Sequence, residues 1–475
     1  MSAATAAPEG LGGDATLTEL PLLRRERIWG FWDYSSVNVG LAIATWAFLQ
    51  GGAVAYYVGA KAAVASIVIG YGISVLLVSL APCLPCGRYG VEQFVSMRSV
   101  LGERGARVLM VVMSALLAAA WSAVLAIMCG HALANVTNQL FGTELTSGSG
   151  VVSVLALLAL AASWVIVSRG PRSIELVNRF VAPGLIVVTL VMLVLVFTKV
   201  SWTELTAAPA LDPWGDSRLD FVLAVELNIA GGFAWWPNVG NLARLTKTTR
   251  SAFWPNVIGL FLASVVAAIV GVFAALALGS EDPTLWMVPL GGALLGILAL
   301  AFVGMANVTS VVAQSYSALV AIKGGGGAVV RRMPWALLAC IVLAPAAVLV
   351  FFPTTVYDNY ARFVSWGAIV VAPLCAVQLV DFFFLRRQRL DLRDLHLPAA
   401  ESRYGFLGGW NPIAILALVL GAITYALLLN PVTYEPAGWF PYVTASLPAF
   451  VVAGTAHYVG TRLVLLRSAS WGGYR

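Results

Sequence analysis

Apolar runs of about twenty residues recur along the whole chain, and this recurrence restricts the folds that the chain can adopt. A run of that length, as a helix, spans roughly 30 Å of hydrocarbon. Hydrophobic residues make up 60% of the 475 residues and charged residues only 11%. A soluble protein of this size needs far more charge to stay in solution. The sequence therefore predicts an all-α polytopic membrane protein.

We expect twelve transmembrane helices. Their approximate limits are residues 30–57, 62–82, 107–136, 151–168, 176–198, 221–243, 252–279, 296–322, 334–352, 358–385, 411–429 and 441–465. Proline and glycine interrupt the stretch 281–295, so we expect it to lie along the outer surface. Residues 1–23 lack the charged-then-apolar pattern of a signal sequence, and we interpret them as a disordered cytoplasmic tail.

The basic residues test this count independently, because Lys and Arg collect in short cytoplasmic loops. With the N terminus inside, all 28 basic residues except Lys61, Lys199, Arg218 and Arg362 fall in segments expected in the cytoplasm. A miscounted span would scramble this pattern. Both termini are thus expected on the cytoplasmic side of the cell (plasma or inner) membrane. The net charge of +6 then reflects orientation and is no sign of nucleic-acid binding.

Two of the expected helices carry residues that interrupt a helix. Span six contains "NIAGGFAWWPNVGN" (residues 228–241), in which glycines and a proline free backbone groups. Span one contains "SSVNVGLAIATW" (residues 35–46). Glycine and proline are common in membrane helices, so one break alone would mean little. Corresponding breaks in spans one and six, which run in opposite directions, favour an inverted repeat and secondary transport.

The inverted repeat divides the chain into segments. Residues 24–199 form the first repeat with spans one to five, and residues 200–385 form the second with spans six to ten. Residues 386–475 provide a cytoplasmic loop and the last two spans. The predicted fold is therefore a twelve-helix, five-plus-five inverted repeat with broken helices one and six.

Features from four spans lie at a similar depth. Gly40, Trp121, Gly232 and Thr309 are each 12 to 14 residues from a cytoplasmic Arg or Lys. At a rise of about 1.5 Å per residue, this places them roughly 18–21 Å from those anchors, near the middle of the bilayer. Secondary transporters keep their binding sites at that level.

Three longer motifs resemble those of one known family, the nucleobase–cation symporter-1 family. They are "LVDFFFLRRQRLDLRDLH" (residues 379–396), "YGFLGGWNP" (residues 404–412) and "GRYGVEQFVSMRSVLGERG" (residues 87–105). The resemblance runs from about Glu26 to beyond Pro412. It implies a secondary active transporter that imports a planar nitrogen heterocycle by cation symport with alternating access. Such substrates include a nucleobase, hydantoin, allantoin or a related vitamin precursor.

The resemblance also implies a site for the coupling ion, Na⁺ or H⁺, and no other cofactor. The family's Na⁺ site corresponds here to the carbonyls of Gly40 and Ile43 and to Ala306, Thr309 and Ser310 of the run "ANVTS". Na⁺ is a hard cation that prefers about five oxygen ligands, which can be neutral. Considered alone, the two hydroxyls could instead bond back within their own helix.

The family stacks its substrate ring between an aromatic residue on span three and one on span six. Trp121 and Phe233 correspond to these positions. A flat π-face suits a flat ligand. The alternative for each is ordinary packing.

The residues expected to hydrogen-bond to the ring differ from the family pattern. Where hydantoin transporters place hydrogen-bonding side chains, this chain has Ala44, Leu125 and Ser315, with Gln314 beside the last. A buried polar ligand binds much more weakly without its partners. We therefore expect a heterocycle other than a hydantoin, or one that hydrogen-bonds to Asn38, Gln314 or Ser315.

Other interpretations stay open. Glu226, in the outer part of span six, is either functional or a charged residue in a wet vestibule. An amino-acid transporter of the same fold would need a carboxylate site at the break in span one, and a non-transporting ligand sensor would bind without uptake. An enzyme is disfavoured, because the sequence carries no nucleophile–base motif, phosphate loop or metal cluster.

Overall fold

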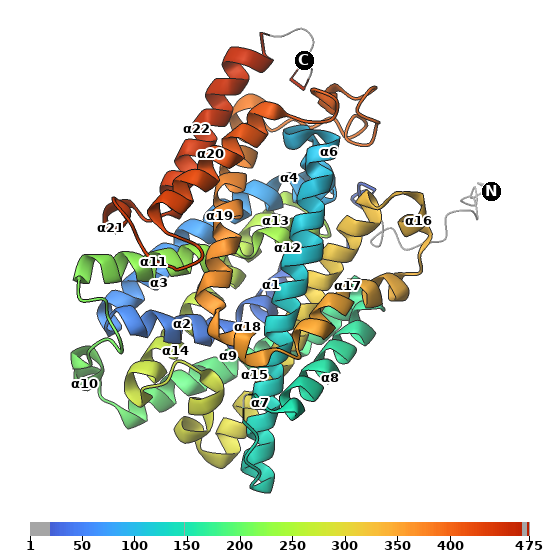
Figure 1. The fold of residues 1–475 in the computed structure, drawn as a ribbon. Coiled ribbons are helices and arrows are strands. Elements are labelled where there is room, and N and C mark those ends of the chain that lie inside the picture. The colour runs from blue at the N-terminus through green and yellow to red at the C-terminus, as the bar shows by residue number, and fades with distance from the viewer. Residues whose placement is uncertain (1–19, 147, 468–472, 475) are drawn as a thin grey trace, which may run out of the picture.

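The chain folds into a bundle of helices (Figure 1). The computed structural model describes residues 20–146, 148–467 and 473–474, so most of the predicted tail, residues 1–23, lies outside the described residues. Within the described ranges the regular elements are helical, and β-pairing is limited to isolated bridges. The predicted all-α class is confirmed.

The first half of the bundle begins with a broken helix. Helices α1 (Phe31–Ala42) and α2 (Thr45–Tyr57) are bent by 51° at their junction. The backbone is extended at Ala44, with φ −134° and ψ 176°. The other elements of this half are α3 (Ala60–Val78), a π-helical turn (Ser79–Cys83), α4 (Leu84–Tyr89), α5 (Gln93–Ser96), α6 (Arg98–Met110), a π-helical turn (Val111–Leu117), α7 (Ala118–Phe141), α8 (Gly150–Val167) and α9 (Pro171–Lys199).

The second half begins after the short helix α10 (Trp202–Ala207) with α11 (Ser217–Phe233) and α12 (Trp236–Ala243). It continues with α13 (Thr249–Pro255), a π-helical turn (Asn256–Leu262), α14 (Ala263–Leu278), α15 (Pro283–Gly325), α16 (Gly327–Arg332), α17 (Trp335–Leu349), α18 (Pro353–Asp358), α19 (Tyr360–Leu379) and a π-helical turn (Val380–Leu385). The last segment holds a 3₁₀ turn (Arg403–Gly405), α20 (Pro412–Leu428), α21 (Phe440–Val443), α22 (Ser446–Gly460) and a π-helical turn (Thr461–Leu465).

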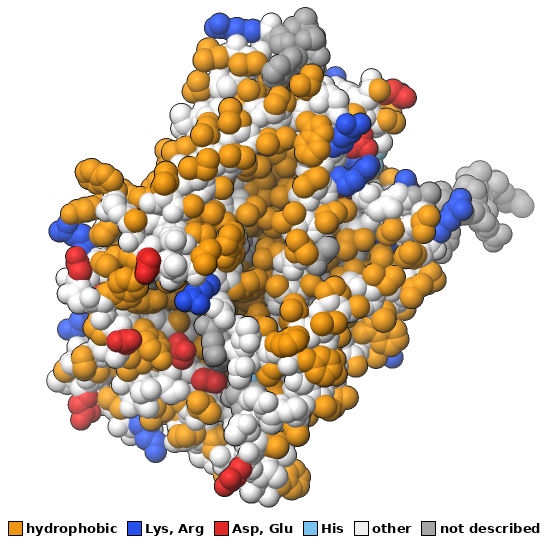
Figure 2. Space-filling model, viewed as in Figure 1, with side chains coloured by type: hydrophobic (Ala, Val, Ile, Leu, Met, Phe, Trp, Pro, Cys, Tyr) orange, Lys and Arg blue, Asp and Glu red, His pale blue; other side chains and the backbone are white. Residues whose placement is uncertain are grey.

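Much of the visible surface is hydrophobic (Figure 2), as a lipid-facing surface requires. Among the described residues, eight helices are long and apolar enough to cross a membrane, or nine if the bent pair α1–α2 is one span. Two shorter apolar helices are α17 and α20. A polytopic membrane protein is thus confirmed, whereas the number of twelve spans stays a prediction.

Helix α15 contains the interrupted stretch 281–295. Its backbone leaves the helical conformation at Gly292, with φ 68° and ψ −177°, values that favour glycine. This break separates a short leading helix from the long helix that follows. The sequence therefore marked the interruption correctly.

The break in the sixth span differs from the one expected. Residues 217–233 are continuous helix, and only Ala234–Trp235 interrupt the helical hydrogen bonding, rather than Gly231–Gly232. Both residues keep helical φ and ψ values, so Ser217–Ala243 continues as one span without the sharp bend of α1–α2. A Cβ on Gly232 would lie 1.9 Å from Ser74 Oγ on α3, and one on Gly231 would lie 2.9 Å from Gln50 Nε2. These glycines therefore allow close packing of α11 against its neighbours, a common use of small residues in membrane helices.

Helices distant in the sequence pack together around the two interrupted spans. Helix α1 contacts α9, α2 contacts α14, and α15 runs along α7. Helices α20 and α22 lie together beside α19 at one edge of the bundle (Figure 1). The segments α1–α2, α7, α11–α12 and α15, which carry the predicted site residues, thus share the interior.

Candidate functional site

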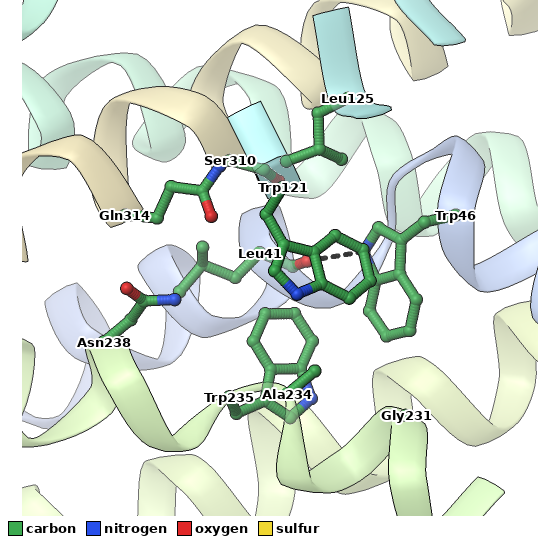
Figure 3. A pocket seen from close by; sticks show the side chains of 10 residues that line it. All are labelled: Leu41, Trp46, Trp121, Leu125, Gly231, Ala234, Trp235, Asn238, Ser310 and Gln314. Atoms are coloured by element: carbon green, nitrogen blue, oxygen red, sulfur yellow. Dashed lines mark hydrogen bonds between the residues drawn. The ribbon is translucent and has the colours of Figure 1, made fainter. Parts of the chain in front are cut away.

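A cavity lies between the two interrupted spans, α7 and α15 (Figure 3). Its empty volume, which includes space open to solvent, is about 370 Å³, and little of it can hold a water molecule. This volume lies at the lower end of the range of about 300–1,000 Å³ that is typical of small-molecule sites, and side chains fill most of the space between the helices. The residues that line it are Leu41, Trp46, Trp121, Leu125, Gly231, Ala234, Trp235, Asn238, Ser310 and Gln314.

Three indole rings gather on one side of the cavity (Figure 3). The Trp46 ring makes edge-to-face contacts with Trp121 at 6.2 Å and with Trp235 at 5.0 Å between centroids. From α19, the rings of Tyr360 and Phe363 approach Trp121 to 6.2 and 5.0 Å. These contacts hold Trp121 in place while its indole still borders the cavity. The arrangement suits a flat aromatic ligand.

Two amide side chains face the cavity beside the indoles. Asn238 comes from α12 and Gln314 from α15 (Figure 3). Gln314 Nε2 donates a hydrogen bond to Ser122 Oγ on α7 at 3.1 Å, which fixes the orientation of this amide. Each amide offers both donors and an acceptor. None of the ten described lining residues is charged.

Of the five predicted substrate residues, Trp121 and Gln314 line the cavity, whereas Phe233, Asn38 and Ser315 do not. Phe233 is completely buried in the packing of α11. Asn38 faces the other way, because its Nδ2 donates to Asn256 Oδ1 at 3.0 Å. Ser315 is buried on α15 with a hydroxyl that has no hydrogen-bond partner among the described residues.

Trp235 takes the position on span six that the sequence assigned to Phe233. Two residues along a helix correspond to a rotation of about 200°, so Phe233 and Trp235 point to nearly opposite sides. The neighbouring Trp236 also packs away, since its Nε1 donates to Gln378 Oε1 at 2.9 Å. Sequence reasoning also missed Trp46 and Asn238 as lining residues. The run "AWWPN" (residues 234–238) contains Trp235 and Asn238, but the sequence does not show which of its side chains face the cavity.

Of the predicted ion ligands, Ser310 and Thr309 of α15 lie beside Gly40 of α1, while Thr309 also bonds back within its own helix, as the alternative interpretation expects. Ser310 Oγ donates to the Gly40 carbonyl at 3.2 Å. Thr309 Oγ1 donates to the Ala306 carbonyl at 2.9 Å. Ile43 follows the last residue of α1 and begins the extended connection to α2. These neutral carbonyl and hydroxyl oxygens fit a hard monovalent cation.

Asn307, between the predicted ligands Ala306 and Thr309, fixes the break itself. Its Oδ1 accepts a hydrogen bond from Thr45 N at 3.2 Å, and its Nδ2 donates to Thr45 Oγ1 at 2.7 Å. The first N–H groups of a helix lack partners in their own helix. Asn307 supplies such a partner to the start of α2, a role that the sequence alone did not reveal.

Comparison with known proteins identifies the family. Residues 21–450 match the family described as permeases for cytosine/purines, uracil, thiamine and allantoin. The chain belongs to this nucleobase–cation symporter-1 family. It is therefore a membrane transporter and no enzyme, as the sequence predicted.

Individual relatives of this permease agree with that result. The purine-uracil permease NCS1 of Arabidopsis thaliana is 23% identical over 441 residues, which cover 85% of this chain and 69% of that protein. The structure of Mhp1, a nucleobase-cation-symport-1 family transporter in a closed conformation with bromovinylhydantoin bound, has a TM-score of 0.76 and 18% identity. That likeness covers 95% of this chain and 96% of Mhp1. An inward-facing Mhp1 structure has a TM-score of 0.75 at 18% identity, over 94% of this chain and 93% of that one. The fold is thus that of a secondary transporter.

A second group of hydrogen bonds in the permease lies below the cavity, on the side predicted to face the cytoplasm. We call Glu92, Gln93, Asn241 and Ser317 the inner cluster. Asn241 Nδ2 donates to Glu92 Oε1 at 2.9 Å and to the Ser317 carbonyl at 3.1 Å, and Asn241 Oδ1 accepts from Gln93 N at 2.8 Å. Burial raises the pKa of the Glu92 carboxyl. The inner cluster ties α12 to α5 and α15, so it closes this side of the bundle.

The structure also shows what surrounds Glu226. Its carboxylate accepts hydrogen bonds from Ala445 N, Ser446 N and Ser446 Oγ at 3.1, 3.0 and 2.6 Å. The first two donors lie at the N-terminus of α22, where a negative charge is favourable. Glu226 therefore joins α11 to α22 and does not line the cavity.

Proposed function

We propose that this permease imports a neutral, planar nitrogen heterocycle together with Na⁺ across the cell membrane. The substrate class is a nucleobase, hydantoin, allantoin or related vitamin precursor. The distribution of basic residues supports an orientation with both termini in the cytoplasm. Family membership supports the substrate class, and the side chains of the cavity support its chemistry.

The cavity suits a flat ring with a polar edge. Trp121 and Trp235 offer indole faces, and Asn238 and Gln314 offer amides beside them (Figure 3). An amide pairs well with the alternating N–H and C=O groups of such heterocycles. The uncharged lining favours a neutral ligand, because a buried charge without a partner is strongly unfavourable.

The proposal of ion coupling depends on the position of Ser310, between the cavity and the predicted ion site. It lines the cavity, and its Oγ donates to the Gly40 carbonyl at the predicted ion site. The next residue after Gly40, Leu41, also lines the cavity. An ion that recruits Ser310 and Gly40 therefore changes the wall of the substrate site, which is the differential contact that coupling requires.

Na⁺ fits this site better than a proton does. The five predicted ligands are carbonyl and hydroxyl oxygens, which do not take up a proton near neutral pH. Inward movement of one charge down the membrane potential releases about 2.3 kcal/mol per 100 mV. That is enough for roughly fifty-fold accumulation of a neutral substrate.

The test is a thermal-shift screen of purines, pyrimidines, hydantoins and vitamin precursors, with Na⁺ and with choline, followed by uptake of the best ligand into proteoliposomes. We expect binding and uptake to require Na⁺. Uptake driven equally well in choline would refute Na⁺ coupling. Competition by amino acids and not by heterocycles would support the amino-acid alternative, and binding without uptake would indicate a sensor.

A further inference from the structure

Asn178 on α9 presents a buried oxygen that has no hydrogen-bond partner among the described residues. The side chain is 2% exposed. Its Nδ2 donates to the Ile174 carbonyl one turn earlier, at 2.9 Å. Buried amide oxygens are almost always paired, so the unpaired Oδ1 requires an explanation.

The orientation of this amide is fixed by its surroundings. Exchange of Oδ1 and Nδ2 would place the oxygen against the Ile174 carbonyl, which is itself only an acceptor. The unpaired atom facing away from Ile174 is therefore the oxygen.

That oxygen lies against the predicted ion site. A Cβ on Gly40 would lie 1.7 Å from Asn178 Oδ1 and 3.7 Å from Thr309 Oγ1. The amide oxygen thus occupies the place where any other residue at position 40 would put its side chain. Gly40 and Thr309 are both predicted ligands of the cation, and the oxygen lies beside the Gly40 Cα, on the side of that residue that also faces Thr309 Oγ1.

Two similar asparagines show what is particular to Asn178. Asn256 also donates one turn back along its helix, to the Ala252 carbonyl, but its Oδ1 accepts from Asn38. Asn228 donates to the Ala224 carbonyl and likewise leaves its Oδ1 unpaired among the described residues. However, Asn228 meets Gly70 of α3 through its Cβ. Asn228 is therefore a comparable buried asparagine that packs against α3.

We propose that Asn178 Oδ1 is a further ligand of the coupling cation, supplied by α9. This inference rests on the proposed Na⁺ site. An amide oxygen is a neutral, hard donor of the kind that Na⁺ accepts, and it would either join the five predicted carbonyl and hydroxyl ligands or replace one that does not reach the ion. The cation would then hold three helices together, so movement of α9 relative to α1 would weaken ion binding.

The experiment is a Na⁺ titration of the purified full-length permease by calorimetry or tryptophan fluorescence. Asn178→Leu removes the oxygen at similar volume, and Asn178→Asp keeps an oxygen but loses the donor to Ile174. Asn228→Leu is the matched control. We expect Asn178→Leu to raise the Na⁺ Kd about tenfold or more, and Asn228→Leu to change it little.

The Asp variant separates a ligand from a structural residue. If Asn178 only supports its helix through Ile174, the Asp and Leu variants lose that support alike, and both weaken Na⁺ binding. If it is a ligand, Asn178→Asp binds Na⁺ at least as tightly as the wild type. The Na⁺ affinity of Asn178→Asp therefore distinguishes a ligand from a structural residue even if the Leu variant fails to fold.

Two results would overturn the proposal, and they differ. Wild-type affinity in Asn178→Leu, or weakened binding in Asn178→Asp, would remove Asn178 from the site while the Na⁺ site stands. A wild-type protein that binds its heterocycle without any Na⁺ response would remove the proposed ion site, and this inference with it.

Discussion

Asn307 on α15 and Thr45 on α2 exchange two hydrogen bonds across the break in the first span. The pair connects the run that carries the predicted ion ligands Ala306, Thr309 and Ser310 to the start of the outer half-helix. Ion binding and the geometry of the break are therefore mechanically linked.

Asn307→Ala should destabilise the permease by about 1–3 kcal/mol, because it leaves the buried Thr45 N–H without its partner. A thermal denaturation in detergent measures this loss. The double variant with Thr45→Val tests the pair directly, since contacting residues show non-additive effects. Additive losses would show that the two residues do not act together.

Trp235→Ala should weaken substrate binding by roughly 5- to 150-fold, because stacking of one base on an aromatic ring contributes about 1–3 kcal/mol. Phe233→Ala, two residues earlier, should instead lower stability by about 3–5 kcal/mol as a large-to-small core substitution. Ligand titration and thermal unfolding of both variants measure the two effects. Weakened substrate binding in Phe233→Ala, with only a loss of stability in Trp235→Ala, would make Phe233 the residue of span six that stacks on the substrate.

Thr309→Ala should abolish the increase in melting temperature that Na⁺ produces in the wild type. Ligand binding to the folded state stabilises it by RT ln(1 + [L]/Kd), so a lost site removes the effect. Thr189→Ala is the matched control, because Thr189 is also buried and donates back along its own helix, to the Leu185 carbonyl. A full Na⁺ response in Thr309→Ala would exclude Thr309 as a ligand.

Asn241→Leu should loosen the inner cluster, since it removes hydrogen bonds to Glu92, Gln93 and Ser317. We expect faster amide hydrogen exchange in α5 and α12, the elements that Asn241 joins. Mass spectrometry of peptides from these two helices detects the change, and peptides from α20 serve as the internal reference. Unaltered exchange in α5 would mean that other contacts keep this side closed.

Glu226→Gln should lower stability, by about 1–3 kcal/mol, and leave the Na⁺ affinity of the folded protein unchanged. Its amide oxygen can still accept from Ala445 N and Ser446 N, but the negative charge that strengthens these bonds at the N-terminus of α22 is lost. Thermal unfolding and a Na⁺ titration of the same preparation separate these effects. A large change in ion affinity would give Glu226 a role in coupling.

The sequence was sufficient for the features that depend on spacing along one helix. Apolar length predicted the membrane helices, and the run with Ala306, Thr309 and Ser310 was recognised by its resemblance to the family's motif. The break in span one followed from its polar residues. These patterns are local, so they can be recognised in the sequence without knowledge of how the helices pack.

The substrate side could not be derived in the same way, because it depends on helical phase and on partners far along the chain. Phe233 and Trp235 are both aromatic, and only the packing of the helix decides which one faces the cavity. Asn38 and Asn238 are equally polar in the sequence, yet Asn256 engages the former. Asn178 required the approach of α9 to Gly40, which no motif encodes.

The filling of the cavity by side chains bears on how molecules compete for this carrier. Because little of the cavity can hold a water molecule, the side chains that line it, Trp121 and Trp235 among them, must move apart to admit a ring, and the helices that bear them must then close again. A compact heterocycle permits that closure and travels through. We expect a bulkier analogue that binds the same indoles to hold them apart and so to inhibit transport. Tight binding alone therefore does not make a molecule a transported substrate.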